Sequence, residues 1–468
     1  MADTPEDALA HCVANGRYED LPADVVALQK TVLLTNLGCA LGGANEAGCA
    51  AAVDVVRHWG GRPEASLWVH GGKVPAHQAA FANSIMARAL DLDDIMQPGI
   101  HVGAAAVPVA LALAERMGEA DACSGKALLA ALALGTEVAA RINAASEYDG
   151  FDPVGVCAVF ACAAIAARLM GLNATQTRDA LGIAFNRAGG SFQNNVDGAL
   201  AVRFVQGFAA ENGIVAAELA RRGVNGPRHF LTGVHGYFHL YAKDKANTDL
   251  VAGALGTRFE QRRTAFKRYP SSGSTLGSTQ AALEIVARHA VDLDDITAVR
   301  VKVSRGTFKN AGQAFELGAH AAVNAQFSIR YCVANALLRK AARIAHFEPE
   351  AVADPRIAAL VALIDVQADA ATEQRGRLAA DVEVETRSGE RLRGAVDIPA
   401  GMPGNPLAAE EHLARFHECV AHARPSWPEA RIARLVGAVE EIEACGDVRH
   451  LLPLITRPPV QVVMPCDA

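Results

Sequence analysis

The chain has 468 residues, of which 51% are hydrophobic and only 5% aromatic, and its formal net charge is -7. This length allows two or three domains, and the small aliphatic side chains predict a core of closely packed helices. The mild, dispersed charge excludes a nucleic-acid-binding surface and a polybasic membrane surface, so we expect small-molecule chemistry.

The acidic N-terminus and the lack of a long apolar run predict a cytoplasmic protein with no membrane partner. The sequence begins with the acidic run Met-Ala-Asp-Thr-Pro-Glu-Asp, where a secretory signal is basic, and no apolar run reaches eighteen residues free of charge. Ten cysteines are scattered along the chain without a Cys-x-x-Cys pair. We expect them to be reduced thiols of the core.

Helical segments follow one another from about residue 21 to residue 223. Residues 127–145 and 159–169 are examples, in which Ala, Leu and Val dominate. Residues 157–170 are hydrophobic nearly all round, so this helix must be covered on every side. We therefore expect one large helical domain, and another subunit is one candidate for part of its cover.

Charged residues interrupt this apolar sequence between Asp91 and His101. The flanking segments 79–90 and 102–114 both read as buried helices. Pro98 and Gly99 should break the first helix and turn His101 back toward its end. A carboxylate beside an imidazole orients it and raises its pKa, which suits acid–base catalysis. On spacing alone, capping aspartates and a core histidine explain the segment at least as well.

Arg203 lies within the apolar helical segment 201–220, ahead of Gly207, Ala210 and Gly213. A guanidinium in such surroundings can bind a carboxylate through two hydrogen bonds. A structural ion pair is an equal alternative.

The pattern changes after Phe266. Residues 296–304 alternate as a half-buried strand does, and residues 380–396 read as two strands joined at Ser388-Gly389. Residues 328–345 and 355–363 read as helices between them, and the amphipathic helices 408–423 and 428–445 follow. The sequence predicts a mainly α fold with a smaller α+β domain: a discontinuous helical domain of residues 1–266 and 400–468, and an α+β lid of residues 267–399.

A turn rich in Ser and Gly follows Lys267 and Arg268 and leads into a helix. Free N–H groups at a helix start, together with Lys267, can hold an anion such as a substrate carboxylate. A domain linker with a well-capped helix is the alternative. No metal site is expected, because His235 and His239 have no acidic third ligand nearby.

Taken together, these segments resemble the MmgE/PrpD family, whose members include 2-methylcitrate dehydratase, cis-aconitate decarboxylase and iminodisuccinate epimerase. The resemblance spans nearly the whole chain. It rests on an ordered series of segments: Ala-Ala-Phe-Ala-Asn before residues 91–94, His101, and residues 135–138, 181–184, 207–213, 267–270, 326–331 and 401–406.

The resemblance implies a helical domain closed by the C-terminal helices, an inserted α+β lid, a homodimer, and neither a metal nor an organic cofactor. It also implies an active site at the domain interface, lined by Asp91, His101, Lys267 and Tyr331. Our hypothesis is that His101 transfers the proton, Asp91 orients it, Lys267 and Arg203 hold carboxylates, and Tyr331 assists the leaving or protonated group.

The predicted substrate-binding residues are Asp94, Arg203, Arg268, Ser272, Asp152 and Arg88. Several positions near the site depart from the family pattern. Ile95 replaces a usual threonine, Asp152 a histidine, Val202 a lysine, Ser272 a cysteine or histidine, Leu276 a histidine, and Arg88 a histidine.

We expect a lyase that acts on a small di- or tricarboxylic acid, first of all a hydro-lyase similar to 2-methylcitrate dehydratase, or a related carbon–carbon lyase such as a decarboxylase. Because the departures remove imidazoles and add the carboxylate of Asp152, two alternatives stay open. One is a racemase or epimerase of a substrate similar to iminodisuccinate. The other is a degenerate homologue that binds carboxylates without activity.

Overall fold

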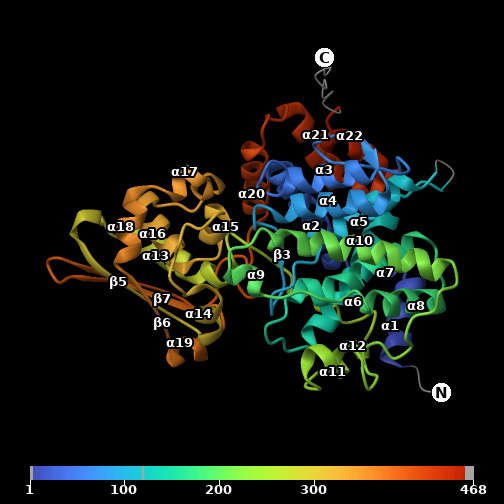
Figure 1. The fold of residues 1–468 in the computed structure, drawn as a ribbon, viewed down its shortest axis with the longest axis horizontal. Helices are drawn as coiled ribbons and strands as arrows, with labels where there is room; N and C mark the ends of the chain where they lie inside the picture. Colours follow the sequence, from blue (N-terminus) through green and yellow to red (C-terminus); the bar gives the residue numbers. More distant parts are fainter. Residues whose placement is uncertain (1–3, 119–120, 459–468) are drawn as a thin grey trace, which may run out of the picture.

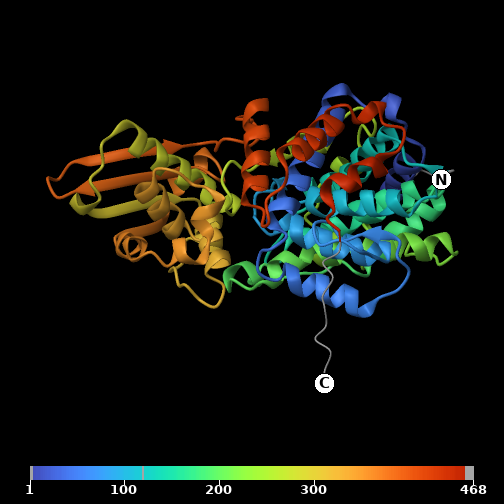
Figure 2. The ribbon, with the colours of Figure 1, turned by 90° about the horizontal axis from the view of Figure 1, so that it is seen from above.

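The computed structural model describes residues 4–118 and 121–458, and these form two lobes (Figures 1 and 2). A large lobe of packed helices occupies one end of the molecule, and a smaller lobe with the main sheet occupies the other. The predicted fold class, mainly α with a smaller α+β part, is confirmed. The exact boundaries at residues 267 and 399 stay a prediction.

Fifteen helices of the described residues build the large lobe. They are α1 (Pro5–Asn15), α2 (Ala23–Gly43), α3 (Cys49–Trp59), α4 (Ala76–Arg88), α5 (Gly103–Arg116), α6 (Gly125–Ala144), α7 (Val159–Leu169), α8 (Ala174–Phe185), α9 (Gln193–Val196), α10 (Ala201–Arg221), α11 (Tyr237–Ala242), α12 (Asp249–Ala252), α20 (Ala409–His422), α21 (Glu429–Glu440) and α22 (Leu452–Ile455). Two short antiparallel ladders accompany them, β1 (Ala65–Ser66) with β2 (Lys73–Val74) and β3 (Asp94–Ile95) with β4 (Ala265–Phe266).

Small residues let the helices of this lobe approach closely, as the Ala-rich composition predicts. A Cβ added at Gly207 of α10 would lie 2.8 Å from the Phe81 ring of α4, and one at Gly213 would lie 2.3 Å from Cys162 Cβ of α7. Only glycine fits at such distances. α10 therefore packs directly on α4 and α7, and α7 is buried on all sides as its sequence predicts.

The C-terminal helices return to the large lobe. Phe416 of α20 belongs to its hydrophobic core, and a Cβ at Gly42 of α2 would lie 2.3 Å from the carbonyl oxygen of Cys419. In both ribbon views α20 stands at the border between the lobes (Figures 1 and 2).

The small lobe is built around a four-stranded sheet in the order β6-β5-β7-β8. β5 (Ile296–Val303) pairs parallel with β6 (Ile364–Ala368) and antiparallel with β7 (Ala380–Thr386), which pairs antiparallel with β8 (Arg391–Val396). The accompanying helices are α13 (Leu276–Arg288), α14 (Arg305–Ala311), α15 (Ala321–Gln326), α16 (Ile329–Arg339), α17 (Pro349–Val352), α18 (Pro355–Ala362) and α19 (Ala370–Arg375). α13 and α16 pack together, and α13 covers β7 and β8.

Two helices, Ala23–Gly43 and Gly125–Ala144, are long and apolar enough to cross a membrane. The apolar windows of these helices are 72% and 89% buried inside the fold, as expected for core helices. The nine cysteines within the described residues are all free, and seven of them are buried, in line with the predicted core thiols.

Candidate active site

The two-stranded ladder of β3 and β4 creates the site. Asp94 pairs with Phe266 and Ile95 with Ala265, so the charged segment after α4 lies against the chain that enters the small lobe. This register brings Lys267 Nζ to 2.6 Å from Asp91 Oδ1 and 3.0 Å from the Asp91 carbonyl oxygen. Residues 176 positions apart thus meet, as the family resemblance implies.

A buried cluster of two carboxylates, two cations and an imidazole surrounds this contact. Asp91 also forms an ion pair with Arg88, from the end of α4. Asp93 lies 3.6 Å from Arg88 Nη1 and 3.9 Å from Lys267 Nζ. Its other oxygen, Oδ2, is 3.1 Å from His101 Nδ1. The predicted orienting role of Asp91 therefore needs correction, because the carboxylate that contacts His101 is that of Asp93.

The contact with Asp93 fixes the tautomer of His101. A carboxylate only accepts hydrogen bonds, so Nδ1 of a neutral imidazole must carry the proton and Nε2 keeps a free lone pair. Burial and the charge of Arg88 lower the pKa of His101, although Asp93 opposes the shift. The sequence predicted a raised pKa, and burial reverses it. His101 is a neutral base at pH 7.

The other members of the cluster stabilise one another in their charged forms. Burial alone would raise the pKa of Asp93 and of Asp91, but the neighbouring cations outweigh it and lower both. Burial lowers the pKa of Lys267, and the Asp91 carboxylate opposes that shift. Arg88 and Lys267 thus face two carboxylates, which leaves little positive charge in this cluster for a substrate.

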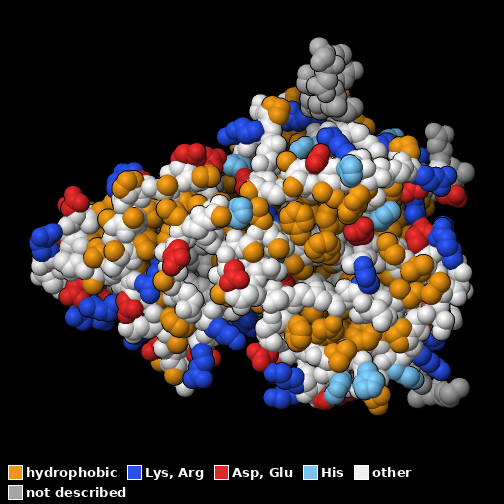
Figure 3. Space-filling view, in the orientation of Figure 1, with side chains coloured by type: hydrophobic (Ala, Val, Ile, Leu, Met, Phe, Trp, Pro, Cys, Tyr) orange, Lys and Arg blue, Asp and Glu red, His pale blue; other side chains and the backbone are white. Residues whose placement is uncertain are grey.

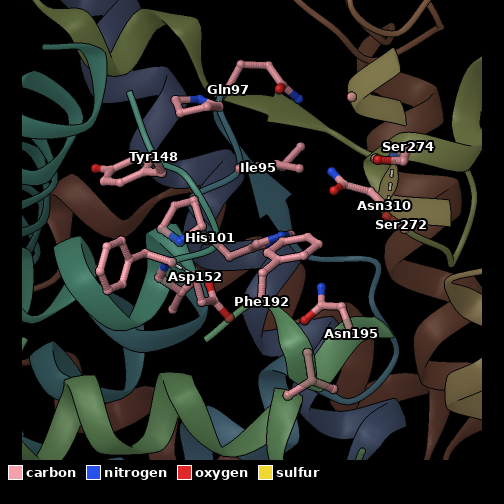
Figure 4. A pocket seen from close by; sticks show the side chains of 18 of the residues that line it. Ile95, Gln97, His101, Tyr148, Asp152, Phe192, Asn195, Ser272, Ser274 and Asn310 are labelled. Carbon is pink, nitrogen blue, oxygen red and sulfur yellow. Dashed lines mark hydrogen bonds between the residues drawn. The ribbon is translucent and has the colours of Figure 1, made fainter. Parts of the chain in front are cut away.

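A cavity of about 850 Å³ opens between the lobes beside this cluster (Figure 4). The large lobe contributes the segments 97–99, 146–154 and 191–196, the last of which includes α9, and the start of α10. The small lobe contributes residues 272–274, part of α14, Phe327, Arg377 and Leu378. Six of the ten predicted site residues line the cavity: His101, Asp91, Lys267, Ser272, Asp152 and Arg88.

Asp152 presents a second titratable group to the cavity. Its Oδ1 accepts a hydrogen bond of 2.9 Å from Val154 N, at the start of a π-helical turn, η3 (Val154–Ala158). Burial raises the pKa of Asp152 to about 6, because Arg88 and the backbone N–H groups compensate only part of the desolvation. Figure 4 shows Asp152 and His101 on the large-lobe wall, and Ser272, Ser274 and Asn310 on the opposite wall.

Four of the predicted site residues lie outside the cavity, which corrects their expected positions. Tyr331 is buried between Phe315 and Phe347, and its hydroxyl donates to the carbonyl oxygen of His346. Asp94 accepts hydrogen bonds of 2.8 Å from Asn36 Nδ2 and 3.0 Å from Gly103 N, so both its oxygens serve the fold.

The other two are arginines with protein partners. Arg203 donates to the carbonyl oxygen of Ala47 at 2.8 Å and lies 3.8 Å from Glu46, which is the structural alternative that its sequence left open. Arg268 is 48% exposed and lies 3.2 Å from Glu411 of α20. Neither arginine lines the cavity.

Several lining residues escaped the sequence reading. Asn195 and Gln206 are buried, and each has a side-chain oxygen with no hydrogen-bond partner among the described residues. Lys309 and Arg377 come from the small lobe. Nothing in their local sequence marks them, because they reach the cavity only through the packing of the two lobes. The sequence did contain a signal for Asp93, because this residue lies inside the charged segment between Asp91 and His101.

No group of three or more His, Cys, Asp or Glu side chains suited to a metal ion occurs within residues 4–118 and 121–458.

Comparison with known proteins identifies the family of the chain. The model of the MmgE/PrpD N-terminal domain matches residues 7–249, and that of the MmgE/PrpD C-terminal domain matches residues 269–441. The chain is 26% identical to a cis-aconitate decarboxylase-like protein of Aspergillus oryzae, covering 96% of each chain. It is 25% identical to the cis-aconitate decarboxylase of Homo sapiens, covering 97% of this chain and 95% of the human one. The chain belongs to the MmgE/PrpD family.

Proposed function

We propose that this protein is a lyase that acts on a small carboxylic acid, with His101 as the base that removes a proton from a carbon next to a carboxylate. The observation that carries the proposal is the Asp93–His101 contact at the cavity wall, which leaves Nε2 of a buried, neutral imidazole free to accept a proton.

The presence of both His101 and Asp152 in the cavity lining favours dehydration among the reactions of such a lyase. Removing water requires a base for the proton and an acid for the departing hydroxyl group. Burial lowers the pKa of His101, which suits a base, and raises the pKa of Asp152 to about 6, which suits an acid. His101 takes the proton from carbon, Asp152 gives a proton to the hydroxyl group, and an alkene and water result.

Two other reactions are the alternatives. The relatives named above favour decarboxylation, in which a carbon–carbon bond breaks and the carbanion takes up a proton. Epimerisation is supported by the same proton removal without a leaving group. Both reactions build up negative charge on the substrate carbon next to a carboxylate, as the proton removal in dehydration does.

A screen of small di- and tricarboxylic acids by thermal shift, followed by product analysis, tests the proposal. A dehydratase yields an alkene that absorbs in the near ultraviolet, a decarboxylase releases CO₂, and an epimerase returns its substrate with inverted configuration. Stabilisation by an acid without any of these products would contradict the proposal and favour a binding protein.

We also propose that the protein forms a homodimer in the cytoplasm. Phe208, Val215 and Leu219 share one face of α10 and are exposed by 52%, 38% and 38%. Figure 3 shows hydrophobic side chains gathered on this side of the large lobe. A second copy that covers this face would bury the apolar surface.

A further inference from the structure

The cavity has an apolar wall that the proposed proton transfer does not use. Ile95, Phe192, Val196, Val202 and Phe327 contribute to it. Val202 of the large lobe and Phe327 of the small lobe belong to the same hydrophobic cluster. The wall is therefore continuous across the border between the lobes, next to the acid–base cluster.

Val196 shows that this wall is open to a ligand. It ends the short helix α9, and the residue is 52% exposed although it lines the cavity. When an apolar ligand group covers an exposed apolar side chain in a cavity, the burial of both surfaces favours binding.

The charges of the cavity point to an acid with few carboxylates. Among the described residues, five basic and four acidic side chains line it. Arg88 and Lys267 are already paired with Asp91, and Lys309 lies 3.7 Å from Asp149. Arg263 lies 3.7 Å from Glu260. The lining thus has a formal excess of only one positive charge, against the three negative charges of a tricarboxylate.

The guanidinium of Arg377 forms no ion pair or hydrogen bond within the described part of the chain, and it faces the cavity from the small lobe. A guanidinium binds a carboxylate through two parallel hydrogen bonds.

We propose that the substrate is a carboxylic acid with one or two carboxylates and an apolar substituent of several carbons. Arg377 binds a carboxylate at the small-lobe edge of the cavity, and the wall of Ile95, Val196, Val202 and Phe327 takes the apolar substituent. This inference rests on the proposed function, because it places the reacting carbon between these two subsites and next to His101.

Calorimetric binding of three acids without a leaving group tests the inference on the whole chain. Succinate and 2-butylsuccinate carry the same charge and differ in the apolar substituent, and tricarballylate adds a third carboxylate. We expect 2-butylsuccinate to bind at least about tenfold more tightly than succinate, since each buried methylene favours binding. We expect tricarballylate to bind no more tightly than succinate.

Three results would overturn the inference: equal affinities for succinate and 2-butylsuccinate, tightest binding of tricarballylate, or no measurable binding of any of the three acids.

Matched variants locate the subsite. Val196→Asn should reduce the preference for 2-butylsuccinate to less than about threefold. Val234→Asn changes a valine that is 83% exposed outside the cavity and should leave the preference intact. An unchanged preference in Val196→Asn would reject this wall as the subsite, and circular dichroism checks that both variants fold.

Failure of this inference differs from failure of the proposed function. Turnover of small acids without a preference for the apolar substituent rejects the inference alone. Selective binding by a protein that turns over no acid rejects the proposed function alone.

Discussion

At the residue scale, the site depends on Asp93. This carboxylate contacts His101 Nδ1 at 3.1 Å and lies within 4 Å of both Arg88 and Lys267. It therefore orients the proposed base and offsets part of two buried positive charges. Its Oδ1 has no hydrogen-bond partner among the described residues, so ion pairing alone holds this oxygen.

Asp93→Asn should impair both activity and stability. The amide no longer fixes the tautomer of His101 by charge, and we expect kcat to fall about 10²- to 10⁴-fold. Because Arg88 and Lys267 lose a counter-charge in the interior, we expect the free energy of unfolding to fall by about 3–5 kcal/mol. Steady-state kinetics and urea unfolding measure the two effects. Asp54→Asn on the exposed side of α3 is the control, and equal kcat values in both variants would contradict the role of Asp93.

The pH dependence of activity tests Asp152. Its pKa of about 6 in the fold means that it is protonated below pH 6 and ionised above it. If it donates the proton to the leaving group, kcat falls as the pH rises through about 6, while His101, with its lowered pKa, still acts as a base there. Asp152→Asn keeps the acceptor for Val154 N but has no proton to give.

We expect Asp152→Asn to lower kcat about 100-fold and to remove the alkaline decline. A decline that persists in this variant would show that another group causes it.

At the element scale, the β3–β4 ladder holds the site together. It links the segment before α5 to the chain that enters the small lobe, and Ile95 and Ala265 pack there with Tyr269, Leu276 and Met402. Asp94 fastens β3 to the first residue of α5 through Gly103 N. The position of Lys267 against Asp91 follows from this register.

Gly103→Ala should displace the ladder. The added Cβ would lie 2.1 Å from Asp94 Oδ1 and 2.3 Å from Asn36 Nδ2, so β3 or α2 must move. We expect a loss of about 1–3 kcal/mol in unfolding free energy together with lower kcat. Gly118→Ala, after the end of the same helix, meets nothing within 4 Å and should have neither effect. Wild-type stability of Gly103→Ala would contradict the close packing described for this ladder.

The elements also show where sequence patterns suffice. The periodicities of 159–169, 296–304 and 380–396 predict α7, β5 and the β7–β8 hairpin almost to the residue. The helix predicted for 328–345 ends at Arg339, because Lys340 adopts a left-handed conformation. The strand β6 and the short helices α14 and α15 escaped detection, since five to seven residues carry too little periodicity to stand out.

At the scale of the whole molecule, the site lies where two lobes meet, and this limits what the sequence reveals. The segment Asp91–His101 and Lys267 were predictable because each concentrates charge in apolar or turn-forming surroundings. Tyr331 was predicted to line the cavity, but its ring packs against Phe347. The local sequence carries no signal for the direction of this side chain. Arg377 reaches the cavity only through the relative placement of the lobes, which no local pattern encodes.

The exposed apolar face of α10 can be tested as the proposed dimer interface. Phe208→Asp places a charge among Val215 and Leu219 and should shift the protein from dimer to monomer in sedimentation velocity. Val234→Asp is the control. Val234 is 83% exposed and lies outside α10, so this change should leave the dimer intact. A wild-type protein that sediments as a monomer would rule out the proposed homodimer.

Solvent deuterium exchange tests the central claim, that His101 removes a proton from a carbon next to a carboxylate. The substrate found in the acid screen is incubated with enzyme in D₂O, and the recovered acid is analysed by mass spectrometry. We predict deuterium at that carbon with the wild-type protein and none with His101→Gln, while His58→Gln on the exposed side of α3 exchanges normally. Exchange by folded His101→Gln at the wild-type rate would contradict the claim.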